Sequence, residues 1–202
     1  MKKVLLLALG IVFSASLAFG QAGYIGLFSD AAHTNCNLTI NDVEGFKRVY
    51  VYHMLAAGTT ASMFGIKTTG LTGDIDNECD LTGITNQFTL VIGDPFFEPP
   101  YDTDNAGVAY SYGSCVTTGL IYLARINFYC MGITIPPTCS MLEVVAAPDA
   151  PTGTIEVVGC ADDKMIGNGF RMMINPDGTC ICGIVVPTQD SSWGKIKSLY
   201  NL

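Results

Sequence analysis

The chain has few basic side chains, and it has only two histidines. It contains 10 lysine and arginine residues against 18 aspartate and glutamate residues. If an N-terminal leader is removed, Lys2 and Lys3 are lost with it. The remaining chain then has 8 basic residues against 18 acidic ones, a net charge of −10. So acidic a surface repels phosphate backbones, which excludes nucleic acid as an expected partner. It also disfavours anionic membranes, while divalent cations and neutral polymers remain open as ligands.

Motifs that carry catalysis are also absent. The chain contains no Gly-x-Ser-x-Gly, no His-Glu-x-x-His and no phosphate-binding glycine-rich loop with lysine. His53 follows an apolar run and shares a face, by alternation, with Val49 and Val51, which predicts a half-buried histidine satisfied by a neighbour. His33 lies in a polar loop, and the same interpretation applies to it. A catalytic base is the alternative for both histidines.

Long hydrophobic runs are confined to the N-terminus. A lysine pair precedes an apolar run over residues 4–13, and small residues follow up to Gly20. This is the layout of a secretory signal peptide, with a cut before Gln21, and we assign residues 1–22 to the leader. The apolar run is too short to span a bilayer, so no membrane span is expected in the mature chain. We predict secretion to the extracellular space or the periplasm.

All eight cysteines lie after this leader, and an even count in an exported chain predicts a disulfide framework. They are Cys36, Cys79, Cys115, Cys130, Cys139, Cys160, Cys180 and Cys182. The zinc spacing Cys-x-x-Cys does not occur. Locality favours a loop closed by Cys130 and Cys139, and a bond from Cys160 to Cys180 or Cys182. The last two share one face of a strand, so we expect them to bond different partners.

Alternating or β-branched runs dominate the mature chain. They occur at residues 49–52, 88–92, 108–112, 120–128, 142–145, 155–158 and 170–174. Glycine, proline, asparagine and aspartate cluster between them, as is typical of strand ends. Many short strands without interleaved helices predict an all-β fold, a disulfide-stapled β-sandwich. We expect the sandwich domain at residues 23–148, with C-terminal strands and a terminal helix at 149–202 packed on it.

That helix is expected from the spacing of apolar residues near the C-terminus. Trp193, Ile196, Leu199 and Tyr200 recur at helical intervals after a serine cap. A short C-terminal helix that docks its tryptophan on the sandwich explains the pattern. A sorting or anchoring tag is the alternative.

One acidic stretch suggests a hard cation. Asp102, Asp104 and Asn105 precede Gly107, and Ca²⁺ prefers several carboxylate and carbonyl oxygens. A second stretch, residues 74–80, alternates acidic side chains in the same way. Neither stretch matches an EF-hand. The alternating oxygen ligands nevertheless lead us to consider a calcium site at the first stretch. The alternative is a pair of solvated turns.

The longest segment without strand patterning is residues 94–107. It contains Phe96, Phe97 and Tyr101 among three prolines. Rigid aromatic side chains are typical of recognition surfaces, so we consider this segment a recognition loop. A long connection without a function of its own is the alternative.

Four stretches of the chain resemble secreted β-rich proteins of environmental bacteria that have no known activity. These stretches are residues 23–30, 142–148, 174–180 and 193–200. The resemblance implies a secreted β-rich protein and gives no site. The strand order over residues 61–128 is also similar to cohesin-type and immunoglobulin-like sandwiches, and this likeness implies a fold alone.

Export, acidity and the missing catalytic motifs favour a non-catalytic extracellular or cell-surface module for binding or adhesion. A polysaccharide or a protein at the cell surface would be its partner, and calcium the only cofactor considered. Outer-face tyrosines, Tyr50 with Tyr52 or Tyr110 with Tyr112, would stack on sugars, or else they fill the core. Two alternatives remain: a secreted glycoside hydrolase with a carboxylate pair from the acidic stretches, and a structural protein that self-assembles through strand edges.

Overall fold

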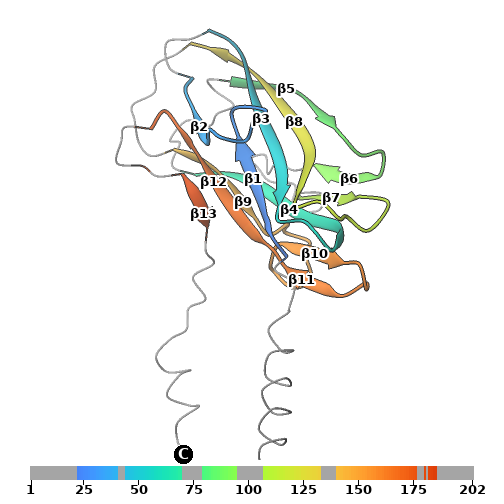
Figure 1. The fold of residues 1–202 in the computed structure, drawn as a ribbon. Helices are drawn as coiled ribbons and strands as arrows, with labels where there is room; N and C mark the ends of the chain where they lie inside the picture. Colours follow the sequence, from blue (N-terminus) through green and yellow to red (C-terminus); the bar gives the residue numbers. More distant parts are fainter. Residues whose placement is uncertain are drawn as a thin grey trace, which may run out of the picture.

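The computed structural model describes residues 22–40, 44–69, 79–94, 107–132, 140–176, 180 and 182–185, and these residues contain strands but no helix. Figure 1 labels the strands: β1 (Tyr24–Phe28), β2 (Asn37–Leu38), β3 (Glu44–Met54), β4 (Thr59–Thr69), β5 (Cys79–Asn86), β6 (Val91–Asp94), β7 (Gly107–Ser111), β8 (Leu120–Met131), β9 (Met141–Val145), β10 (Glu156–Gly159), β11 (Lys164–Ile166), β12 (Asn168–Ile174) and β13 (Gly183–Val185). Residues 1–21 of the expected leader, which was assigned to residues 1–22, lie outside the described residues, and so does the expected helix. The all-β prediction is confirmed.

The strands form two layers that share β4 (Figure 1). From Gly65 onward β4 pairs with β9, within a long sheet of order β4–β9–β12–β1–β3–β8–β5. The preceding part of β4 pairs with β7 on one side and β10 on the other, and β6 and β11 extend this short sheet. One strand therefore belongs to both sheets and joins the layers of the sandwich.

Pairing in the long sheet is mixed. Strand β12 runs parallel to both β1 and β2, whereas its pairs with β9 and β13 are antiparallel. The C-terminal strand β12 therefore lies between β9 and β1, inside the sheet. Two short strands that are distant in the sequence, β2 and β13, both pair with β12. This arrangement brings Cys36 and Cys182 together.

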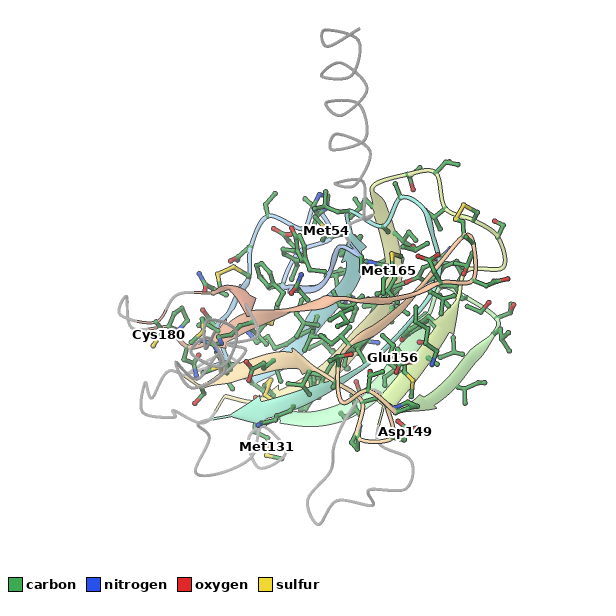
Figure 2. All side chains as sticks on the ribbon, turned by 90° about the horizontal axis from the view of Figure 1, so that it is seen from below. Met54, Met131, Asp149, Glu156, Met165 and Cys180 are labelled. Atoms are coloured by element: carbon green, nitrogen blue, oxygen red, sulfur yellow. A yellow bond between two sulfur atoms is a disulfide. The ribbon has the colours of Figure 1, made fainter. Side chains whose placement is uncertain are left out.

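The core fills the space between the two sheets (Figure 2). Alternation along β1 and β3 turns Leu27, Val49 and Val51 inward, and all three are buried. From the short sheet, Phe64 and Tyr110 stack their rings 5.8 Å apart in the same cluster. Because each strand sends every second side chain inward, the other set of side chains on each strand faces away from the core.

Three disulfides join described residues: Cys36–Cys182, Cys79–Cys130 and Cys115–Cys160. Cys180 is disulfide-bonded as well, and no described cysteine is free. The disulfide framework expected for an exported chain is thus present in this part of the molecule. Because Cys182 bonds Cys36, it does not bond Cys180, as predicted.

Both local pairing hypotheses are wrong. Cys130 bonds Cys79, not Cys139, because the antiparallel register of β5 and β8 places Cys79 directly opposite it, with the Cα atoms 3.9 Å apart. Cys160 bonds Cys115 and neither of the cysteines near the C-terminus, because the end of β10 meets the connection from β7 to β8. Register across a sheet, rather than closeness in sequence, decides these pairs.

Candidate functional site

A groove of about 610 Å³ lies between β3 and the connection from β1 to β2. Its lining consists of Ser29, Asn35, Asn37, Leu38, Thr39, Phe46, Lys47, Arg48 and Tyr50. We call it the β3 groove. Its volume falls within the usual range of ligand sites. The lining combines aromatic rings, amides, hydroxyls and two cations, and none of its described residues carries a carboxylate.

Strand β3 provides one wall of this groove. Its inward residues are buried, so Phe46, Arg48 and Tyr50 alternate with them on the outer face of the long sheet. The Phe46 side chain is 69% exposed, and its ring meets Tyr129 edge to face at a centroid distance of 5.3 Å. A large ring that stands open beside a hollow is a typical anchor for a ligand.

The connection from β1 to β2 provides the other wall, and hydrogen bonds within it fix its shape. The Asp30 carboxylate accepts from the Thr34 backbone N–H at 2.8 Å and from the Thr34 hydroxyl at 2.6 Å. These bonds to the charged form lower the pKa of Asp30. The Ser29 N–H donates to the Asn35 carbonyl at 2.8 Å, which closes the turn.

Three longer-range contacts hold this wall in place. The Tyr52 hydroxyl on β3 donates to the Ala31 carbonyl at 2.8 Å. The Ile40 N–H donates to the Asn175 side-chain oxygen at 2.8 Å. The disulfide of Cys36 joins the wall covalently to the residue that precedes β13. The first contact ties the two walls to each other, and the other two anchor this wall to residues next to β12 and β13.

The two cations of the groove have no partner among the described residues. Neither Lys47 nor Arg48 forms an ion pair or a hydrogen bond with any described residue, whose only ion pairs are Lys164–Glu156 and Arg171–Glu143. The nearby carboxylates are engaged elsewhere, because Asp30 binds Thr34 and Glu44 accepts from the Tyr129 hydroxyl at 2.6 Å. Positive charge in the groove therefore remains available to a ligand.

Aromatic rings continue from the groove across the outer face of the long sheet. Successive ring centroids lie 5.3 to 6.4 Å apart in the order Tyr24, Phe170, Phe28, Tyr52, Tyr122 and Tyr50. The tyrosine alternatives are thus resolved: Tyr50 and Tyr52 are on the outer face, whereas Tyr110 and Tyr112 are buried between the sheets. This row of rings packs on the outer face of the long sheet, next to the β3 wall of the groove.

His53 is a buried structural residue, as the alternation predicted. Its Nε2 lies 2.8 Å from the Ala22 carbonyl, which can only accept, so Nε2 carries the proton. Its Nδ1 lies 2.8 Å from the Tyr112 hydroxyl, which donates to the Ser62 hydroxyl at 2.7 Å. Both ring nitrogens thus have a polar neighbour at hydrogen-bonding distance.

This burial predicts a loss of stability on mild acidification. Burial lowers the pKa of His53 below the 6.5 of an ordinary histidine, so the unfolded chain binds the proton more readily. Its contribution to stability is complete above that value and is lost as the pH falls through the folded-state pKa. We expect the melting temperature to fall between roughly pH 7 and pH 5. The fall should be smaller in His53→Gln and unchanged in His33→Gln; equal slopes in all three proteins would contradict this role.

Several residues chosen from the sequence lie outside the described residues. They are the calcium candidates Asp102, Asp104 and Asn105, the recognition-loop aromatics Phe96, Phe97 and Tyr101, and the acidic residues Asp74, Asp76 and Glu78. Within the described ranges, no three histidine, cysteine or acidic side chains gather into a metal site. No helix in those ranges is long and apolar enough to cross a membrane. The β3 groove was not among the sequence predictions.

Comparison with known proteins gives a likeness at the level of fold. No family model and no curated protein matches the sequence. One similar structure is a cohesin module of a family 33 glycoside hydrolase from Clostridium perfringens, with 9% identity, 77% of this chain and 98% of that chain covered, and a TM-score of 0.43. Another is the sixth cohesin of scaffoldin B from Acetivibrio cellulolyticus, solved with a Cel5 dockerin, with 11% identity, 76% and 96% covered, and a TM-score of 0.41. These scores are low, and no partner for this chain follows from them.

Proposed function

We propose that this protein is an exported, non-catalytic binding module, and that the β3 groove holds a partner found outside the cell or at its surface. One observation carries the proposal: an exposed aromatic ring, two side-chain amides and two cations without a partner among the described residues line a single groove. Those groups bind and orient a ligand, but they do not form a nucleophile and base pair.

The composition of the groove favours binding over hydrolysis. Glycoside hydrolases use a pair of carboxyl groups on either side of the scissile bond. Among the described residues no aspartate or glutamate lines the groove, and the described carboxylates near it, Asp30 and Glu44, are already bonded to Thr34 and Tyr129. A ligand in this position would be held without an acid and a base beside it.

The disulfides support the exported location. Bonds of this kind persist in oxidising compartments and are rare in the cytosol. The fold places one of them, Cys36–Cys182, at the wall of the groove itself. A binding surface that depends on a disulfide suits a protein that works after export.

Two single substitutions on the groove test the proposed function. The mature protein, Phe46→Ala and Arg48→Gln would be titrated against a panel of extracellular polysaccharides and envelope proteins. We expect at least one partner, with an affinity about tenfold lower in each variant, because each loses about 1–2 kcal/mol of contact. Circular dichroism would show that both variants remain folded.

Ile92→Ala serves as the matched control for these variants. Ile92 is 68% exposed on β6, in the short sheet, and does not line the groove. Its replacement should leave binding unchanged. If binding were lost in Ile92→Ala but kept in Phe46→Ala, the partner would dock on the short sheet, and the groove would not be the site.

A further inference from the structure

We propose that the ligand of the β3 groove is a polysaccharide segment that carries carboxylate groups, such as a run of uronic acid residues. This inference rests on the proposed function and specifies the ligand class. The net charge of the chain argues against an anionic ligand, so the case depends on how the few basic residues are distributed. The exposed rings and the amides then distinguish a sugar from other anions.

Basic side chains are concentrated on two neighbouring strands. The described residues contain six of them: Lys47, Arg48, Lys67, Arg125, Lys164 and Arg171. Two are neutralised by glutamates in ion pairs, whereas three lie on β3 and β8. Half of the described positive charge therefore lies on two neighbouring strands, and two of these three residues, Lys47 and Arg48, line the groove. Such local fields attract anions even where the net charge is negative.

Arg125 lies on β8, the strand that neighbours the β3 wall of the groove. It lies directly opposite Tyr50 in the pairing of β3 with β8, and Asn127 lies opposite Arg48 in the same way. The Nε of Arg125 is buried and has no hydrogen-bond partner among the described residues. A guanidinium in this state gains from an anion that pairs with its remaining N–H groups. Arginine suits a carboxylate in particular, because its planar fork matches the two oxygens.

The other groups in the groove suit sugar rings. Phe46 and Tyr50 offer ring faces and edges to the apolar faces of a sugar, as aromatic side chains do for other ring systems. The Asn35 side-chain oxygen accepts from the Asn37 N–H at 3.0 Å, which leaves the Asn35 NH₂ group to donate to a hydroxyl. The Asn37 amide and two hydroxyl side chains complete the polar lining.

An acidic peptide is the competing occupant. Extended peptides commonly bind by adding a strand to an open sheet edge. Strand β8 pairs with β3 along its whole length, whereas β1 pairs with it only from Tyr50 to Met54, so no strand of the described residues covers the groove stretch of β3 on that side. The rings and the amides favour a sugar, and the titration below includes an acidic peptide to separate the two.

Titration with one oligomer in two chemical forms tests the inference. The mature protein would be titrated calorimetrically with oligogalacturonate and with the same oligomer as its methyl ester, which keeps the sugar and removes the charge. We expect at least about tenfold weaker binding of the ester. Arg48→Gln and Arg125→Gln should each weaken binding of the acid form about tenfold, whereas Lys67→Gln, on β4, should not. Binding should also weaken from about 0.1 M to about 1 M salt.

Each contrary result has a definite meaning. Equal binding of the ester would overturn the requirement for carboxylate, and equal binding of poly-glutamate would overturn the requirement for sugar. Absence of oligogalacturonate binding, together with a neutral or protein partner that depends on Phe46, would overturn this inference and leave the proposed function standing. Absence of any groove-dependent partner would overturn both.

Discussion

Replacing Cys36 and Cys182 with serine should lower the free energy of unfolding by roughly 2–5 kcal/mol, the largest loss that we expect from any disulfide described here. The bond joins residues 146 apart in the sequence, so it restricts the unfolded chain more than the other two do. Denaturant unfolding under non-reducing conditions would measure the loss. The same variant should bind its ligand more weakly, because one wall of the groove would be released.

The matched control is the double replacement of Cys115 and Cys160. That bond spans 45 residues, so chain entropy predicts a loss smaller by about 1 kcal/mol. It also lies away from the lining of the groove, so ligand binding should survive the change. If the variant at positions 36 and 182 kept both full stability and full binding, the disulfide would not be supporting the groove wall.

Truncating Phe64 to alanine should cost about 3–5 kcal/mol of folding free energy. Phe64 is completely buried on β4, the strand that both sheets share, and its ring stacks on Tyr110. Removing it leaves a cavity where the two layers meet. Thermal and denaturant unfolding, both followed by far-ultraviolet circular dichroism, would measure the effect.

Phe46→Ala is the matched control for that change. Phe46 is the same residue type, but it is 69% exposed on β3, so its loss should alter stability by only about 0.5 kcal/mol. The two variants should therefore separate stability from binding. Equal destabilisation by both would mean that the placement of these rings is wrong.

Alternation predicted the strands well, but it could not predict a bulge. Simple alternation along residues 120–128 puts Tyr122 on one face with Ala124 and Phe128. In the structure Val51 pairs with Ala124 and Tyr52 with Tyr122, so β8 has one extra residue between the two pairs. Tyr122 therefore turns to the outer face and joins the row of aromatic rings. A period-two pattern contains no sign of this extra residue.

Disulfide pairing could not be predicted because it depends on contacts between distant segments. Cys36 and Cys182 meet because β2 and β13 both pair with β12. Nothing near either cysteine in the sequence encodes that meeting. The expectation of a disulfide framework needed only composition and export, and it was the part of the prediction that succeeded.

The groove was missed because the net charge conceals local charge. Lys47 and Arg48 are two cations in an acidic chain, and the sequence alone suggests only two solvent-exposed charged side chains. They become a site only when Tyr52 holds the connection from β1 to β2 against β3, and the Cys36–Cys182 bond anchors that connection beside β13. The useful signal was the alternation of Phe46, Arg48 and Tyr50, which places rings and charge on the same face.

Mapping of the ligand contact by nuclear magnetic resonance tests the central claim most directly. A partner from the binding panel would be added to the isotopically labelled mature protein, and backbone amide shifts would be followed. We predict that the largest shifts cluster at residues 46–50 of β3 and at residues 29–39, which form the two walls of the groove. Shifts confined to the short sheet, around β6 and β7, would contradict the claim that this groove is the binding site.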